Sequence, residues 1–405
     1  MSDNNYKALT LKREIQHLMN DFFLAENKGD KQARIKAKTL LTNYLIKTDD
    51  GSYTISSDFV NSESENMHTM QGALTESREK FVKPAHLEGK DCVDILDICS
   101  GLGYNAASCL EYLDDEVEVN LDMVEISRET IALSLLLDIP LKSYEIIKKA
   151  VEDKLYEEGV ISFRHIEKKI PERVDINIHL DDARRVVGFL SANSRKYDAI
   201  FLDPFSPLKS PELYTDQFLN ILKNLLKEDG LILTYTSAAP VRAALVNRGL
   251  HVGEGPALGR SGGTVASFNP NLLAKQLSSD DERMIALSDA GISFKDPDLN
   301  ESSNSILINR TRERESLRGL EKFASTVKTP IYLNKEISDA QLSRRVLKNL
   351  ERLGISSLTS FKARYLVCPQ YTNCICGCTC EDYANSGERI LEMSHRLNKM
   401  LKLLK

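Results

Sequence analysis

Residues 93–106 read VDILDICSGLGYNA, an apolar run that leads directly into a glycine-rich turn. The run is typical of a buried strand, and Gly101, Gly103 and Ala106 fit the spacing G-x-G-x-x-G/A of a strand-to-helix turn. Glycines at such a turn let the chain bend sharply and let a ligand approach the backbone. We therefore expect an adenosine-containing cofactor here, because sites for NAD and for S-adenosylmethionine share the pattern.

Four more apolar runs follow, at 117–124, 174–180, 197–203 and 231–237. Stretches of helical character separate them, which predicts βαβ units and a mostly parallel sheet. Residues 141–160 are periodic and rich in Lys and Glu, and they predict an extra helix before the third strand. The chain is thus expected to have an α/β, Rossmann-like fold.

Two acids distinguish between the candidate cofactors. Glu125 ends the second strand, 24 residues after Gly101, where its carboxylate can accept both ribose hydroxyls of an adenosine. Asp97 stands four residues before Gly101, where it would repel the pyrophosphate of a dinucleotide. The ammonium and sulfonium groups of S-adenosylmethionine suit a carboxylate at this place. The loop therefore favours S-adenosylmethionine over NAD.

Further residues complete the predicted cofactor site. Asp182 follows the third strand, where it can accept a hydrogen bond from an adenine amino group and also cap the next helix. The loop adds Leu102, Tyr104 and Asn105, and the ring of Tyr104 either stacks on a base or packs in the core. These residues fall at the ends of three successive strands, where open α/β sheets bind ligands.

The fourth strand ends in Asp203-Pro204-Phe205. Proline stops a strand, so Asp203 either belongs to a plain turn or lies beside a transferable methyl group. In methyl transfer to an amine, much of the catalytic help is positioning, and the lone pair of the nitrogen must be free. We therefore predict that Asp203 is the catalytic residue, which orients the N–H bonds first and accepts a proton second.

Composition limits the class of protein. The 405 residues are 42% hydrophobic and 28% charged, with a net charge of −6, as in a soluble globular protein of about two to three domains. No apolar run reaches the roughly 18 residues of a membrane span. The first 30 residues lack the apolar core of a secretory signal. We expect a cytoplasmic protein with no membrane partner.

Changes of pattern along the chain predict its organisation. Residues 6–47 have helical periodicity, and residues 48–57 resemble a hairpin. The expected regions are a helical N-terminal extension (1–60), the Rossmann-like domain (61–270), a basic linker or helical region (271–365) and a cysteine-rich tail (366–405).

Residues 310–364 are strongly basic within an acidic chain. They hold thirteen Lys and Arg against six acids, a local excess of seven positive charges. Such a segment is either a solvated helical face or a surface that contacts phosphates. The sequence leaves both interpretations open.

Five of the eight cysteines lie within thirteen residues, in CPQYTNCICGCTC (368–380). Neighbouring C-x-C pairs close strained disulfides, and a chain without a secretory signal is expected to keep its thiols reduced. We therefore predict a structural metal site, with Zn²⁺ as the default and an iron–sulfur cluster as the alternative that uses the same ligands. The candidate ligands are Cys368, Cys374, Cys376, Cys378 and Cys380.

Four motifs resemble those of the MnmC-like methyltransferases, in the same order as in that family. They are MHTMQGALTESREKFV (67–82), YDAIFLDPFSPLKSPELYTDQ (197–217), LILTYTSAAPVRAAL (231–245) and Gly259-Arg260. The resemblance covers about residues 48–320. Members of the family have a Rossmann-like fold and use S-adenosylmethionine to methylate the primary amine of 5-aminomethyl-2-thiouridine at the wobble position of tRNA.

The resemblance implies roles for individual residues. The loop from Asp97 to Asn105, with Glu125 and Asp182, would hold the cofactor. The substrate would lie near Asp203 and be bordered by Phe205, Lys209, Glu212 and His68. The chain has no second glycine-rich fingerprint, so it resembles a stand-alone methyltransferase without an FAD-dependent oxidase half. The expected partner is tRNA, against which the metal site would hold the basic segment.

Two other functions remain open. The same type of fold transfers aminopropyl groups to polyamines, and Glu76, Asp203 and Glu212 would suit such a polycationic substrate. A module that binds RNA or protein without catalysis is the alternative from another class. The sequence leaves open the substrate amine, the identity of the metal and the oligomeric state.

Overall fold

The computed structural model describes residues 11–55, 69–258, 262–378 and 382–403. The chain forms two compact units, the first made of Met1–Leu213, Asn224–Tyr235 and Gly255–Gly263, and the second of Tyr214–Lys223, Thr236–Glu254 and Thr264–Lys405. The four-region division expected from the sequence stays a prediction. Among the residues that the structure describes, no helix combines the length and the apolar character needed to cross a membrane.

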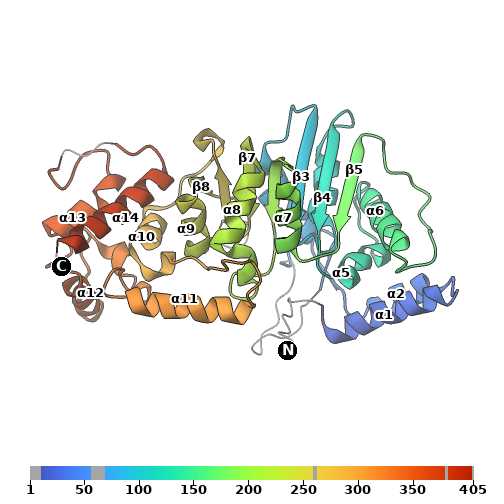
Figure 1. Cartoon of the computed structure of the whole chain (residues 1–405), viewed down its shortest axis with the longest axis horizontal. Helices are drawn as coiled ribbons and strands as arrows, with labels where there is room; N and C mark the ends of the chain where they lie inside the picture. The colour runs from blue at the N-terminus through green and yellow to red at the C-terminus, as the bar shows by residue number, and fades with distance from the viewer. Residues whose placement is uncertain (1–10, 56–68, 259–261, 379–381, 404–405) are drawn as a thin grey trace. The chain divides into compact units, whose positions relative to one another are not determined.

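The first unit is built on a parallel sheet, whose strands lie side by side in the order β5–β4–β3–β6–β7 (Figure 1). Their bounds are β3 (Cys92–Ile98), β4 (Glu118–Val124), β5 (Val174–His179), β6 (Tyr197–Leu202) and β7 (Leu226–Thr234). β3 is central, with Ile95 opposite both Leu121 of β4 and Ala199 of β6. The predicted strands and the Rossmann-like fold are confirmed. The order reverses between β3 and β6, and ligands bind at such a point.

Helices connect these strands, and the extra helix expected within 141–160 is confirmed as α6 (Tyr144–Glu157). Gly103 has a φ of +80°, and a Cβ there would lie 2.7 Å from Ile147 Cγ2 of α6. Both the backbone conformation and the space therefore require glycine. The other connecting helices are α4 (Tyr104–Tyr112), α5 (Arg128–Ala132), η3 (Leu133–Leu136) and α7 (Ala183–Ala192).

The predicted helical stretch 6–47 is divided into α1 (Arg13–Asn27) and α2 (Ala33–Leu41) in its described part. Both bury one apolar face, as the periodicity predicts. β1 (Ile46–Lys47) and β2 (Tyr53–Thr54) pair antiparallel, which confirms a hairpin in this region, although its first strand lies just before the predicted range 48–57. The upstream motif then forms α3 (Ala73–Glu76), η1 (Ser77–Val82) and η2 (Lys83–Ala85).

The second unit is mainly helical and contains an antiparallel pair, β8 (His251–Glu254) and β9 (Thr264–Ser267), that the sequence analysis did not anticipate. α10 (Ser279–Leu287) packs against α14 (Ser386–Lys402) (Figure 1). The remaining elements are α8 (Asp216–Leu225), α9 (Ala239–Asn247), η5 (Pro270–Leu272), η6 (Asp289–Gly291), α11 (Ser303–Leu317), η7 (Ser325–Val327), η8 (Thr329–Tyr332), α12 (Ala340–Arg352), α13 (Phe361–Val367) and η9 (Cys368–Gln370).

Candidate active site

The glycine loop joins β3 to α4 through several residues in left-handed backbone conformations. Cys99, Gly101 and Gly103 have φ angles of +64°, +53° and +80°. The N–H groups of Cys99 and Ser100 both donate to the carbonyl of Val124, at 2.9 and 3.0 Å, which ties the loop to the end of β4. Burial raises the pKa of Cys99, so this thiol stays protonated and is a poor nucleophile.

Glu125 lies at the end of β4 and reaches across to this loop. Its Oε2 accepts from Gly101 N at 3.0 Å, and its Oε1 accepts from Ser127 N at 2.9 Å. Burial raises its pKa, although both backbone hydrogen bonds oppose the rise. A carboxylate has about four lone-pair positions, so Glu125 keeps the capacity to accept further hydrogen bonds from ribose hydroxyls.

Asp97 and Asp203 approach each other where β3 and β6 end. Asn105 Nδ2 donates to Asp203 Oδ2 at 3.0 Å and lies 3.5 Å from Asp97 Oδ1. Asp97 is fully buried, and its Oδ2 has no hydrogen-bond partner among the described residues. Sequence analysis predicted all three as site residues, and the structure brings them together.

No described Lys or Arg lies within 4.0 Å of either carboxyl, and Lys80 acts on Asp203 only from a greater distance. Neither carboxyl therefore forms an ion pair with a described Lys or Arg. Desolvation raises the pKa of Asp97 to about 7 and that of Asp203 to about 8. Asp97 is fully buried and Asp203 is half-buried, and a carboxyl withdrawn from water in this way is stabilised in its charged form by a nearby cation. The ammonium and sulfonium groups of S-adenosylmethionine supply such charge, so the residues present fit that cofactor.

Asp182 caps α7, as the sequence analysis predicted. Its Oδ1 accepts from Arg184 N at 2.9 Å, and its Oδ2 accepts from the Arg184 guanidinium at 2.8 Å. The additional role of Asp182 toward an adenine amino group stays a prediction.

The side chains of Leu102 and Tyr104 are buried in the core of the first unit. Tyr104 stacks on Tyr144 with ring centroids 5.8 Å apart, and its hydroxyl donates to Tyr53 O at 2.9 Å. Tyr144 in turn donates to Leu102 O at 2.8 Å. Of the two roles considered for the Tyr104 ring, the structure shows packing.

The residues predicted to border the substrate follow β6. Phe205 and Lys209 are half-buried, and Glu212 is buried at the start of η4 (Pro211–Tyr214). The fourth candidate, His68, lies outside the described residues.

Sequence analysis missed Lys80 of η1. Lys80 pairs with Glu76 at 3.2 Å, and the charges of the two residues act on Asp203 in opposite directions: Glu76 raises the pKa of Asp203 and Lys80 lowers it. The available signal was the spacing of four residues between them inside the upstream motif.

Four of the five predicted metal ligands converge in the second unit. The Sγ atoms of Cys368, Cys374, Cys376 and Cys378 all lie within 4.8 Å of one another, an arrangement that could hold a metal ion. The fifth, Cys380, lies outside the described residues. Ile375 N also donates to Cys368 Sγ at 3.3 Å, which orders the loop around the first sulfur.

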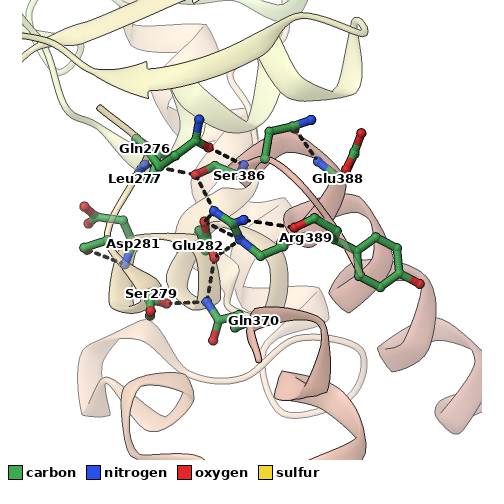
Figure 2. A network of polar contacts seen from close by, with 12 residues as sticks. Gln276, Leu277, Ser279, Asp281, Glu282, Gln370, Ser386, Glu388 and Arg389 are labelled. Carbon is green, nitrogen blue, oxygen red and sulfur yellow. Dashed lines mark hydrogen bonds and ion pairs between the residues drawn. The ribbon is translucent and has the colours of Figure 1, made fainter. Parts of the chain in front are cut away.

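A partly buried polar network fixes the start of this cysteine loop (Figure 2). Gln370 Nε2 donates to Glu282 Oε2 at 2.7 Å and to Ser279 O at 2.9 Å, both on α10. Glu282 is 1% exposed and pairs with Arg389 of α14 at 2.7 Å. Figure 2 shows Ser386 joined to Arg389 and to Leu277, which extends the network to the segment before α10. The cysteine loop is therefore anchored to two packed helices.

Comparison with known sequences agrees with the geometry. A family model described as S-adenosyl-L-methionine-dependent methyltransferase matches residues 143–269. The chain is 34% identical over 346 residues to the uncharacterized protein MJ0670 of Methanocaldococcus jannaschii, an alignment that covers 85% of this chain and 90% of that one. It is 25% identical over 221 residues to the tRNA 5-methylaminomethyl-2-thiouridine biosynthesis bifunctional protein MnmC of Ralstonia nicotianae, covering 50% of this chain and 31% of that one.

A solved structure supports the same conclusion. MNMC2 from Aquifex aeolicus matches with a TM-score of 0.54 at 26% identity, covering 75% of this chain and all of that one. The predicted resemblance to MnmC-like methyltransferases is thereby confirmed, together with S-adenosylmethionine as the methyl donor. The chain matches only about a third of the length of the bifunctional relatives.

Proposed function

We propose that this protein, which belongs to the MnmC-related family of S-adenosyl-L-methionine-dependent methyltransferases, methylates an amine on a modified wobble uridine of tRNA, of the 5-aminomethyl type. The observation that carries the proposal is the pair of uncompensated carboxyls, Asp97 and Asp203, bridged by Asn105 where β3 and β6 end. The tRNA substrate is supported by the names of the distant MnmC relatives.

Each residue of the site has a distinct task in this proposal. When bound, S-adenosylmethionine supplies a methyl group that its sulfonium makes electrophilic. Asp97 would bind a cationic group of the cofactor through its unpartnered Oδ2, and Glu125 would accept hydrogen bonds from the ribose hydroxyls. Asn105 holds Asp203 in place through its amide. The side chains thus position both reactants before the chemistry begins.

Asp203 holds the substrate amine and takes up a proton from its nitrogen, which frees the lone pair for attack. A carboxyl with the ordinary pKa of about 4 is a weak base near neutral pH. Desolvation raises the pKa of Asp203 to about 8 in the cofactor-free protein, which makes its carboxylate a stronger base. The positive charge of bound S-adenosylmethionine would favour the ionised form, which is the form that can accept the proton. The proton then passes from Asp203 to water.

The assay that tests this function uses labelled S-adenosylmethionine. Total tRNA from cells that lack the protein is incubated beside a polyamine mixture, and the tRNA is digested to find the labelled nucleoside. We expect label in a wobble uridine. If the protein binds the cofactor and leaves tRNA unlabelled, the tRNA proposal is wrong.

A second candidate, transfer to a small polycationic amine, is favoured by one observation. Burial is the main cause of the raised pKa of Cys99, and the charges of Glu125, Asp203, Glu212 and Asp97 raise it further. Four carboxyls therefore lie close enough to this loop to act on it, with Glu125 and Asp203 hydrogen-bonded to Gly101 and Asn105. A cluster of carboxyls of this kind suits a polyamine. Label in the polyamine fraction of the same assay would support this candidate.

For the cysteine loop, we propose a structural Zn²⁺ held by Cys368, Cys374, Cys376 and Cys378, with an iron–sulfur cluster as the alternative. The convergence of four sulfurs on an anchored loop supports it. The test measures metal content and free thiols after purification under reducing conditions. One zinc per chain, lost when the predicted cysteines are changed to Ser, is expected. No metal in either protein would overturn the proposal.

A further inference from the structure

The structure separates the basic segment 310–364 into two groups of cations. In the first group, Arg314 and Arg318 pair with the buried Asp289 at 3.0 and 2.8 Å. Arg310 donates to the carbonyls of Ile292 and Ala290, and Lys322 donates to that of Ala286. These charges are used inside the second unit, so the part of the segment around α11 is held mainly by internal contacts.

The second group lies on α12. Arg344, Arg345, Lys348 and Arg352 are exposed, and none forms an ion pair within 4.0 Å in the described part of the chain. At 3.6 residues per turn these positions fall within an arc of about 100°. Val346 and Leu350 point the opposite way and are fully buried. The helix therefore has one buried apolar face and one exposed face on which these four cations lie, with the exposed acid Glu351 at its edge.

An exposed aromatic side chain follows on α13. Phe361 is 65% exposed, which is unusual for a large apolar residue. Its ring lies nearly parallel to that of Tyr365, with centroids 6.2 Å apart and planes at 15°. Arg396 of α14 covers Tyr365 at 4.8 Å. One aromatic ring is thus held by its neighbours while Phe361 remains accessible.

The two helices are connected and anchored. Lys362 of α13 donates to Gly354 O, just after α12, at 2.8 Å. At its other end, α13 leads directly into Cys368 and the anchored cysteine loop. The basic helix and the aromatic platform therefore belong to one supported segment, residues 340–367.

We propose that α12 and α13 form an RNA-binding surface, in which the exposed cations of α12 contact backbone phosphates and Phe361 stacks on an unpaired base. Exposed cations with no described carboxylate within 4.0 Å are complementary to a polyanion. The accessible ring of Phe361, on the helix that follows α12 in the chain, favours unpaired RNA over an acidic protein. The inference rests on the proposed function in taking tRNA as the RNA. The inference places the RNA contact on α12 and α13, whereas the sequence alone indicated the whole basic segment 310–364 as a candidate surface.

The test compares two triple variants of the full chain in tRNA binding at 50 to 200 mM salt. One carries Arg344→Ala, Arg345→Ala and Lys348→Ala. The matched control carries Lys28→Ala, Lys31→Ala and Arg312→Ala, which also removes three exposed cations without an ion pair within 4.0 Å. Three lost phosphate contacts should reduce the slope of log K against log salt by about 2 and weaken binding roughly 10- to 100-fold at low salt. The control should bind within about twofold of the unmodified protein.

A single variant tests the stacking contact. Phe361→Ala should weaken tRNA binding about tenfold, with the salt slope unchanged because no charge is removed. An unchanged affinity for S-adenosylmethionine and an unchanged Tm would show that each variant is folded.

The outcomes distinguish this inference from the proposed function. If the α12 variant binds tRNA as tightly as the control and the unmodified protein methylates tRNA, the proposed binding surface is wrong and the proposed function is supported. If the α12 variant loses binding but the unmodified protein methylates no tRNA, the surface stands and the function is wrong. Binding of the unmodified protein to anionic lipid vesicles or polyglutamate in preference to tRNA would overturn the surface as an RNA site.

Discussion

Asp97 in the first unit and Asp289 in the second are both fully buried aspartates, and their surroundings differ. Asp289 accepts from Ser325 N at 2.6 Å and pairs with Arg314 and Arg318. Burial alone would raise the pKa of Asp289, but these hydrogen bonds and charges outweigh it and hold the pKa below its ordinary value. Burial raises the pKa of Asp97 to about 7, opposed only by hydrogen bonds from Ser100 and Asn105.

This difference between Asp97 and Asp289 shows how a buried carboxylate with a structural role can be distinguished from one with a functional role. Removing one partner of a fully paired buried charge costs stability, because the remaining charges are left uncompensated. A buried carboxyl without a cation has the opposite effect, since its ionisation weakens the folded state until a ligand supplies the charge. Strongly shifted pKa values therefore mark candidate sites only when the compensating group is missing.

The largest expected effect is on catalysis and tests Asp203, the proposed catalytic member of the pair Asp97 and Asp203. Asp203→Asn removes the proton acceptor but keeps an amide of similar size, so methyl transfer should fall about 10²- to 10⁴-fold. The affinity for S-adenosylmethionine should change far less, as titration calorimetry would show. Asp175→Asn, an exposed acid-to-amide change on β5, is the control. If Asp203→Asn turned over at the control rate with normal cofactor binding, its catalytic role would be excluded.

The next effect tests the compensated aspartate. Asp289→Ala leaves the guanidiniums of Arg314 and Arg318 without their shared carboxylate, and should lower the free energy of unfolding by about 3–5 kcal/mol. Denaturant titration measures it. Asp298→Ala, at an exposed position of the same unit, should change it by less than about 0.5 kcal/mol. Equal stability of the two variants would contradict a structural role for Asp289.

The same contrast explains what the sequence could predict. The strand 93–98 was predictable because strands buried on both faces are mostly apolar, and only Asp94 and Asp97 interrupt this run. Glycine spacing located the loop. The β8–β9 pair was missed because each strand has four residues, too few for a pattern. The partners of Asp289 lie 25 and 29 positions away, so charge counting could not show which Arg side chains are internally paired. For the same reason the bridge by Asn105 became visible only in the fold.

A smaller effect, of opposite sign for stability and function, is expected at Asp97. Asp97→Asn removes a buried charge that no described cation compensates, so the cofactor-free protein should gain about 1–3 kcal/mol of unfolding free energy at pH 8. Its affinity for S-adenosylmethionine should fall about 10- to 100-fold, because the cofactor loses a charged partner. Parallel thermal unfolding and cofactor titration would measure both, with the exposed Asp91→Asn as control. A loss of stability in Asp97→Asn would show that Asp97, like Asp289, is compensated.

The smallest effect is the dependence of stability on pH, and its sign follows from the raised pKa values. Asp97 and Asp203 bind protons more tightly in the folded protein, so their contribution is complete below about pH 4 and is lost as the pH rises through about 7 and about 8. Asp289 has a lowered pKa, so it adds no slope in this range. Between pH 7 and pH 8.5 the unmodified, cofactor-free protein should therefore lose about 2 kcal/mol relative to an Asp97→Asn/Asp203→Asn variant. Saturating S-adenosylmethionine should reduce this loss, because its positive charge stabilises the ionised carboxyls. Parallel pH profiles of the two cofactor-free proteins would instead mean that the two carboxyls are already ionised and compensated without the cofactor.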